Sequence, residues 1–249
     1  MRILHITPSF EEPGGLERYV RCLAKGLAER GHYVCVISTF RTTKETIRYS
    51  EDKLDIILCP VLGKIRDLKL STGYLAAIIK SKFKENFDIV NVHAHNHIAF
   101  ELTLLKSKLS GIPIVVTFHA PRPSGDIIYE FLFHSYENIV FRSSLSLVDK
   151  IIVPSSLYLR AVWKLFYKSI KSGKVAVVPP GLDASFIDKY GVNADKIYEK
   201  FSEKLSKELK IILFVGRLSS TAVYKRPDIL LQSFKIVTKY VPSARLILV

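Results

Sequence analysis

A histidine at the end of an apolar run is the first candidate for chemistry in this chain. His119 follows residues 114–118 (Ile-Val-Val-Thr-Phe) and precedes Ala120-Pro121. If the run is a strand of a parallel sheet, the imidazole lies at the carboxyl end, where such sheets bind ligands. A histidine there can hydrogen-bond a ligand, or it can be a partly buried residue satisfied by the protein itself. Position alone leaves both interpretations open.

Three further histidines alternate after the run 89–92. His93, His95 and His97 would point to one side of an extended chain, which raises the question of a metal site. Metal sites usually add a carboxylate or a thiolate and a supporting second layer, and the neighbouring sequence supplies neither. We therefore favour a polar cleft lining over a metal centre, and we expect no bound metal.

A second group of polar residues follows the run 211–215. Arg217 comes directly after Gly216, and Lys225 follows in the loop before the next helical pattern. An arginine fork and a lysine point charge at a strand–helix junction suit a diphosphate. The alternative is a pair of solvated surface cations, which the Gly-Arg step and the position of Lys225 make less favourable.

Gly14 and Gly15 lie between the first strand and the first helix. Glycines at this point let backbone N–H groups and the helix N-terminus approach an anion closely. The sequence lacks the G-x-G-x-x-G dinucleotide fingerprint, so nicotinamide chemistry is not favoured. A tight turn without a ligand is the alternative.

The chain is strongly basic, with 37 Lys+Arg against 23 Asp+Glu and a net charge of +14. Part of the excess lies on one stripe of a helix expected over residues 157–171, at Arg160, Lys164, Lys168 and Lys171. A core-packing helix with a solvated basic edge is the favoured interpretation, and contact with anionic lipid is the functional alternative. The basic residues follow no nucleic-acid-binding module, so we expect no nucleic acid partner.

The compartment is inferred from what the sequence lacks. Its three cysteines form no CxxC pair, which favours buried thiols in a reducing compartment. The N-terminus enters a strand directly without a secretory signal, and no apolar run is long enough to span a bilayer. We expect a cytoplasmic protein that can bind peripherally to the inner face of the membrane.

Apolar strand patterns alternate with helical patterns along most of the chain. This alternation predicts an α/β fold: a parallel, doubly wound, Rossmann-like sheet with helices on both faces. We place a first domain at 1–187. Residues 188–249 are expected to form a charged linker followed by the start of a second domain. The pattern strand, loop, helix, strand over 211–249 is the first βαβ unit of that second domain. A single such unit cannot bury both faces of its sheet, so we expect the domain to be incomplete and to favour association.

Taken together, these segments resemble the family 4 retaining glycosyltransferases of the GT-B fold. The order and spacing of the pieces carry the resemblance over nearly the whole chain. The matching segments are residues 3–15, 88–95, 117–120, 152–156, 178–183 and 215–218 with Lys225, Asp228 and Phe234. In two places the sequence departs from the family: Arg226 stands where glycine is usual, and Pro180 where asparagine is usual.

The resemblance implies a two-domain transferase with an acceptor-side first domain and a nucleotide-sugar-binding second domain. It implies that His119 contacts the transferring sugar and that Arg217 and Lys225 bind the diphosphate and stabilise the departing nucleotide. The other donor- or acceptor-binding positions that it implies are Gly14, Gly15, His93, His95, Gly181, Asp183 and Gly216. The family needs no metal or other cofactor.

Three hypotheses follow. The first is a glycosyltransferase that moves a sugar, with retention, from a nucleotide-sugar to a lipid-linked or glycan acceptor. The second is an inactive or partner-dependent fragment that acts as a binding module. The third is a soluble synthase with a sugar-phosphate acceptor. Because the second domain is incomplete, we expect this chain alone to bind donor weakly and to turn over little.

Overall fold

The structure is a computed structural model of the 249-residue chain. It describes residues 1–11, 14–41, 44–65, 68–93, 98–119, 131, 134–161, 163–181, 210–216, 218 and 225–249. These residues fall into two units: the first extends from Met1 to Gly181, and the second is described from Lys210 to Val249.

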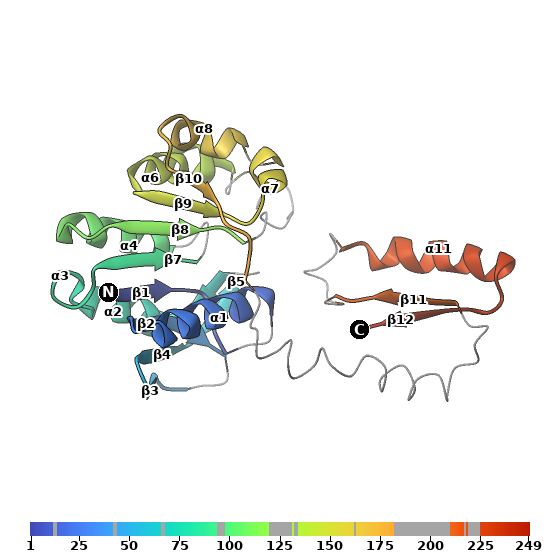
Figure 1. Cartoon of the computed structure of the whole chain (residues 1–249), viewed down its shortest axis with the longest axis horizontal. Helices are drawn as coiled ribbons and strands as arrows, with labels where there is room; N and C mark the ends of the chain where they lie inside the picture. The colour runs from blue at the N-terminus through green and yellow to red at the C-terminus, as the bar shows by residue number, and fades with distance from the viewer. Residues whose placement is uncertain are drawn as a thin grey trace. The chain divides into compact units, whose positions relative to one another are not determined.

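Eight strands form the main sheet of the first unit. Their order is β10-β9-β8-β7-β1-β2-β4-β3, with β10 at the top and β3 at the bottom in Figure 1. Every neighbouring pair is parallel except β3 with β4. Their bounds are β1 (Arg2–Ile6), β2 (Tyr33–Phe40), β3 (Ile47–Glu51), β4 (Leu54–Pro60), β7 (Ile89–Val92), β8 (Ile114–Thr117), β9 (Lys150–Val153) and β10 (Val175–Val177).

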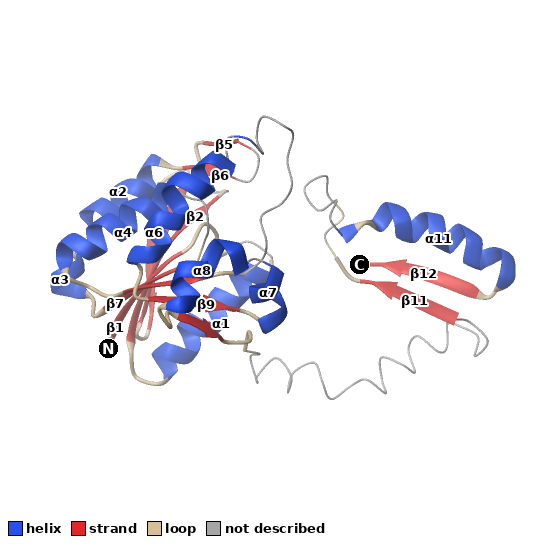
Figure 2. Ribbon diagram, turned by 90° about the horizontal axis from the view of Figure 1, so that it is seen from above, coloured by secondary structure: helices blue, strands red, loops and turns tan. Residues whose placement is uncertain are grey.

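Helices cover both faces of this sheet. Helix α1 packs on one face, while α2, α3 and α4 lie on the other (Figure 2). The helices of the first unit are α1 (Gly15–Glu29), α2 (Thr72–Lys80), α3 (Phe83–Asn86), α4 (Ile98–Ser110), the π-helix η1 (Glu137–Phe141), α6 (Arg142–Leu147), α7 (Ser156–Ala161) and α8 (Trp163–Lys171). The predicted α/β class, a Rossmann-like and mostly parallel sheet with helices on both faces, is confirmed.

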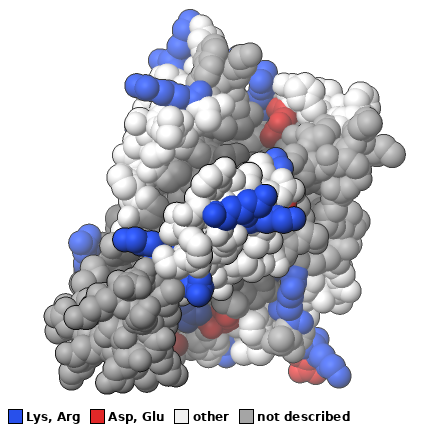
Figure 3. Space-filling view, turned by 90° about the vertical axis from the view of Figure 1, so that its right-hand side faces the viewer, with Lys and Arg blue, Asp and Glu red and all other residues white. Residues whose placement is uncertain are grey.

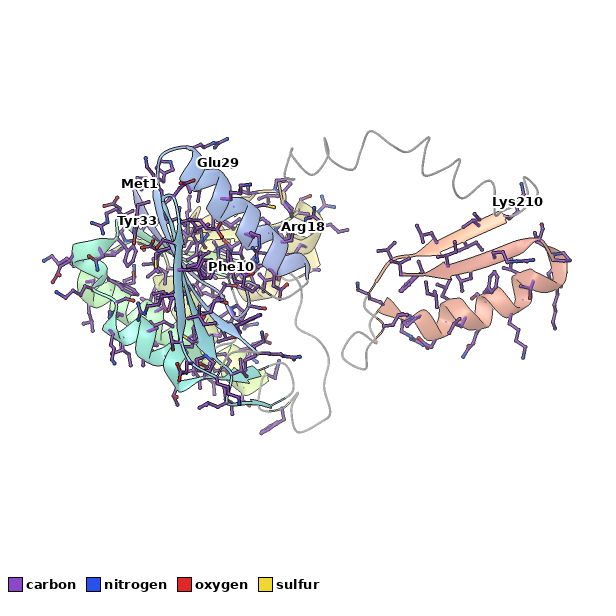
Figure 4. The ribbon with its side chains drawn as sticks, turned by 90° about the horizontal axis from the view of Figure 1, so that it is seen from below. Met1, Phe10, Arg18, Glu29, Tyr33 and Lys210 are labelled. Atoms are coloured by element: carbon purple, nitrogen blue, oxygen red, sulfur yellow. The ribbon has the colours of Figure 1, made fainter. Side chains whose placement is uncertain are left out.

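Local sequence explains how α1 is placed. Its apolar residues recur at helical spacing, and Val20 and Ala24 are buried against Phe10, which lies inside the unit (Figure 4). Arg18 and Glu29 mark its two ends in the same figure. Gly31 then adopts φ +89°, a conformation that glycine tolerates best, and its N–H bonds to the Ala28 carbonyl to end the helix.

The strand order reverses at β1. The chain proceeds outward from β1 through β2 to β4 on one side, and then returns to β7 on the other side of β1 before continuing to β10. This arrangement makes the gap between the carboxyl ends of β1 and β7 the topological switch point, where open α/β sheets bind ligands.

Two features of the first unit differ from the sequence expectation. The edge strand β3 is antiparallel, because a tight turn with Asp52 at φ +49° folds it directly onto β4. A small hairpin of β5 (Gly63–Ile65) and β6 (Leu68–Leu70) was also not anticipated. The helix expected over 157–171 is described as α7 and α8, which lie on either side of residue 162, a position outside the described residues.

The second unit is the βαβ arrangement that the sequence predicts. Strands β11 (Lys210–Phe214) and β12 (Ala244–Leu248) pair in parallel, and α11 (Pro227–Tyr240) connects them. Many of its apolar side chains are exposed, including Leu213 (59%) and Ile236 (59%). The linker helix expected from 188 onward lies outside the described residues, apart from Lys210, which begins β11.

In the described part of the chain, none of the helices is both long and apolar enough to cross a membrane.

Candidate active site

A stripe of buried polar side chains crosses three neighbouring strands at the switch point. His5 in β1, Asn91 in β7 and Thr117 in β8 are all at most 8% exposed. His5 and Asn91 are register partners, and the Thr117 hydroxyl donates to the Asn91 side-chain oxygen at 2.9 Å. Because side chains alternate along a strand, His93 and His119 continue the same side of β7 and β8 past their ends.

Three imidazoles of this stripe form a hydrogen-bonded chain. Nδ1 of His5 lies 2.7 Å from Nε2 of His93, and Nδ1 of His93 lies 3.2 Å from Nε2 of His119. The His5 and His93 rings are stacked, with centroids 5.0 Å apart. The chain of imidazoles extends from the buried His5 in β1 to His119 at the end of β8, where His119 is partly exposed.

Tyr19 of α1 covers the outer part of this chain. Its ring meets the His119 ring edge-on at a centroid distance of 4.7 Å and the His93 ring at 6.0 Å. Helix α1 therefore fixes the histidines from the side opposite the strands. Burial also raises the pKa of the Tyr19 hydroxyl, which keeps it protonated.

Burial keeps the three imidazoles neutral. Desolvation lowers the pKa of His5 and of His119 to about 4. Desolvation lowers the pKa of His93 well below its usual value, and the two neighbouring histidines lower it further. A neutral imidazole donates one hydrogen bond and accepts one, so the site offers polar recognition without a positive charge.

Of the histidines predicted to line the site, the structure places His119 at the strand end and His93 in the interior. His119 lies at the carboxyl end of β8, as expected. His93 is 0% exposed and lies behind His119 instead of lining a cleft beside it, because both of its ring nitrogens are engaged by the other two rings. His95 and His97 lie outside the described residues.

The glycine loop before α1 carries an acidic neighbour. A methyl group built on Gly14 would overlap the Glu17 carboxylate, whereas the same group on Gly15 would meet nothing within 4 Å. Glu17 is in the first turn of α1, where a negative charge is favourable. An anionic ligand at this loop would have to displace that carboxylate, whereas hydroxyl groups could donate to it.

The second unit supplies the predicted lysine. The side chain of Lys225 packs against Gly216 at the end of β11, where an added methyl group would lie 3.2 Å from both Cδ and Nζ of the lysine. Next to it, Arg226 adopts φ +49° and forms an ion pair with Asp228 at 2.8 Å. Gly181 is exposed at the end of the first unit, and Arg217 and Asp183 lie outside the described residues.

The basic residues expected at a membrane are exposed where they are described. Arg160 is on α7, and Lys168 and Lys171 are on α8, with the Lys171 ammonium 4.9 Å from the centroid of the exposed Tyr167 ring. The side chain of Lys164 lies outside the described residues. On the face shown in Figure 3, lysine and arginine cover more of the described surface than aspartate and glutamate.

A pocket of about 510 Å³ opens at the other end of the sheet. Tyr33 and Asp55, at the starts of β2 and β4, line it and hydrogen-bond to each other. Cys35 also lines it, and burial raises the pKa of this thiol to about 12, so it is unreactive. Because ligands of open parallel sheets bind at the carboxyl ends of the strands, we take the histidine chain, rather than this pocket, as the candidate active site.

Among the described residues there is no group of three histidine, cysteine or acidic side chains that could hold a metal ion. The three hydrogen-bonded histidines contact one another through the nitrogens that a metal would require.

Sequence reasoning missed His5, Asn91, Thr117 and Tyr19. The available signal was a single polar residue inside each of three apolar strands: His5 in Ile-Leu-His-Ile, Asn91 in Ile-Val-Asn-Val and Thr117 after Ile-Val-Val. Buried polar groups need partners, so a polar residue at this position in several strands indicates a shared network.

Comparisons with known proteins identify the family. The model of Glycosyltransferase Family 4 matches residues 13–186, and the chain belongs to this family. Among curated relatives, the phosphatidyl-myo-inositol mannosyltransferase of Mycobacterium tuberculosis (strain ATCC 25618 / H37Rv) is 26% identical over 253 residues. That match covers 100% of this chain and 60% of the relative, so the chain spans less than two thirds of the relative's length.

Solved structures share the fold. Anabaena Alr3699/HepE in complex with UDP and glucose matches with a TM-score of 0.61 and 15% identity, over 100% of this chain and 60% of that one. The catalytic domain of starch synthase IV from Arabidopsis thaliana, bound to ADP and acarbose, matches with a TM-score of 0.59 and 13% identity, over 100% and 74%.

Proposed function

We propose that this chain forms the acceptor-side domain and the start of the donor-side domain of a hexosyltransferase. The enzyme would move a sugar from a nucleotide-sugar to a lipid-linked acceptor with retention of configuration. The observation that carries the proposal is the family match over residues 13–186, which contains the whole histidine chain except His5. The relative named above, a phosphatidyl-myo-inositol mannosyltransferase, supports a glycolipid acceptor.

The site chemistry agrees with this proposal. Transfer builds positive charge on the sugar and negative charge on the departing diphosphate. A neutral His119 can hydrogen-bond a sugar hydroxyl without opposing the positive charge that develops on the sugar. Lys225, with Arg217 as the family resemblance implies, would stabilise the diphosphate by charge. The Glu17 carboxylate beside Gly14 suits acceptor hydroxyls better than a second phosphate.

Turnover of the complete product of the gene that encodes this chain tests the proposal. Lys225→Met should lower transfer from UDP- or GDP-hexoses by about 100-fold, the scale of a lost transition-state charge contact. Lys239→Met, at the far end of α11, is the matched control and should leave transfer unchanged. Equal rates in both variants, or no transfer by the wild-type protein from any hexose donor, would refute the proposal.

Peripheral binding to an anionic membrane is a separate part of the proposal. The exposed Lys168, Lys171 and Tyr167 on α8 support it, because cations beside an aromatic ring suit a lipid interface. The protein should float with vesicles that contain phosphatidylglycerol, and flotation should fall with added salt. Replacing both lysines by glutamine should reduce flotation more than Lys235→Gln with Lys239→Gln on α11. Salt-independent flotation would exclude this mode of binding.

A further inference from the structure

The chain of three imidazoles has only two consistent proton arrangements. Each neutral ring carries one N–H and one bare nitrogen. Each of the two hydrogen bonds needs one donor and one acceptor, and both nitrogens of His93 are engaged. His93 therefore donates one of these hydrogen bonds and accepts the other. All three rings must then carry their protons on the same type of nitrogen, either Nδ1 or Nε2.

In the first arrangement the donors point outward. Nδ1–H of His5 donates to Nε2 of His93, and Nδ1–H of His93 donates to Nε2 of His119. His119 then carries its own proton on Nδ1. In the second arrangement every donor points inward: His119 carries its proton on Nε2, and His5 carries its proton on Nε2 in the interior.

The inner end of the chain distinguishes the two arrangements. Nε2 of His5 is buried and has no hydrogen-bond partner among the described residues. In the outward arrangement this atom is a bare lone pair, whereas in the inward arrangement it is an N–H donor without an acceptor. Orphaned N–H groups are rarer in protein interiors than under-satisfied acceptors, which favours the outward arrangement.

We propose that His5 and His93 are positioning residues that fix His119 as the tautomer protonated on Nδ1. His119 thereby presents a hydrogen-bond donor at the switch point, suited to an oxygen atom of the sugar being transferred. The identity of that ligand rests on the proposed function, but the tautomer of His119 does not. His5, at the inner end of the chain of imidazoles, thus determines whether His119 donates or accepts a hydrogen bond at the site.

The tautomer can be measured directly in the 249-residue chain. Two-bond nitrogen–proton correlation spectra of the histidine rings, recorded near neutral pH, separate a protonated nitrogen from a bare one. We expect the His119 pattern of protonated Nδ1 and bare Nε2, with the same pattern at His5 and His93. Protonated Nε2 at His119, or an averaged pattern on both of its nitrogens, would overturn the proposal.

Two substitutions at one position make the test sharper. In His5→Asn the side-chain amide nitrogen takes about the place of Nδ1 and can still donate to His93, so His119 should keep its tautomer. In His5→Asp the carboxylate can only accept, so His93 must donate to it, and His119 should switch to the Nε2-protonated form. An unchanged His119 in a folded His5→Asp variant would contradict the proposal. If that variant does not fold, the wild-type spectrum still decides.

Kinetics of the complete gene product separate this inference from the proposed function. His5→Asp should lower kcat by about tenfold, the scale of one hydrogen bond, while His5→Asn stays within about twofold of wild type. An inactive wild-type protein with the expected His119 tautomer would refute the function and leave the inference standing. Equal kcat in both variants, with the tautomer switched in only one, would refute the link between the tautomer and transfer.

Discussion

Lys225 lies across Gly216, with its Cδ and Nζ atoms 3.2 Å from the place where a side chain on that glycine would begin. The lysine, which lies just before α11, thus packs against the end of β11. A glycine at 216 leaves the space that the lysine occupies, and the ammonium group is held at a strand end, where an anionic ligand can reach it.

Gly216→Ala should therefore displace Lys225 and weaken nucleotide binding while the fold is kept. The lysine is flexible, so the contact can be relieved by moving it. We expect the Kd for UDP, measured by calorimetry or amide shift titration, to rise by roughly threefold to tenfold. Gly63→Ala, where nothing lies within 4 Å of the added methyl group, is the matched control. Unchanged UDP binding by Gly216→Ala would show that the position of Lys225 is unimportant.

Replacing Arg226 by glycine or by alanine separates the effect of backbone strain from that of the lost ion pair. Arg226 adopts the left-handed conformation, which glycine tolerates at least cost and which strains other residues by about 1–2 kcal/mol, and its guanidinium bonds to Asp228. Both Arg226→Gly and Arg226→Ala lose that ion pair, but only glycine also removes the backbone strain. Amide hydrogen exchange in the first turn of α11 should be slower in the glycine variant. Faster exchange in the glycine variant would mean that the strain is negligible.

Stability of the first unit should fall between pH 7.5 and pH 5. The pKa of His5 is lowered by burial from 6.5 to about 4, so the unfolded chain binds a proton in this range and the folded chain does not. Stability therefore rises with pH here and is lost as the pH falls below about 6.5. His5 alone should account for about 2 kcal/mol of loss by pH 5. Urea unfolding followed by circular dichroism measures this.

The histidine chain itself can be tested as the source of this pH dependence. His5→Asn removes one titrating ring and should reduce the slope of unfolding free energy against pH. His134→Gln replaces a histidine on the exposed surface and should leave the slope as it is in wild type. If both variants keep the wild-type slope, the loss of stability comes from other groups.

Alanine substitutions at two glycines, one inside α1 and one just after it, should change the stability of the protein in opposite directions. Gly26 is inside α1 and has open space around its Cα, so Gly26→Ala should stabilise the protein by about 1 kcal/mol through helix propensity. Gly31 ends the helix at φ +89°, so Gly31→Ala should destabilise by about 1 kcal/mol. Thermal unfolding of the pair checks both signs, and a change of the same sign in both would contradict the assigned conformations.

The sequence predicts the parallel strands well because each is a short apolar run bounded by turns and helical patterns. It does not predict β3, because the segment Ile47–Glu51 is mostly exposed and is specified by the tight turn at Asp52 rather than by an apolar pattern.

His119 was recognisable because it ends a strand, but its partners were not. His5 and His93 are 88 residues apart and meet only because β7 returns to lie beside β1. Strand order is a property of the whole fold, and a lone histidine within an apolar strand appears in the sequence as an ordinary core residue. The chain of imidazoles therefore becomes visible only in three dimensions.

The edge strands of the main sheet affect whether the protein aggregates when it is expressed at high concentration. One edge strand, β3, is exposed and carries Arg48 and Glu51, and the other, β10, has three residues. Charged and very short edges are poor templates for strand pairing between molecules. The apolar faces around β11 and α11 lack such protection among the described residues, as the exposed Leu213 and Ile236 show. Aggregation during expression should therefore begin in the second unit, and the first should remain the more soluble part.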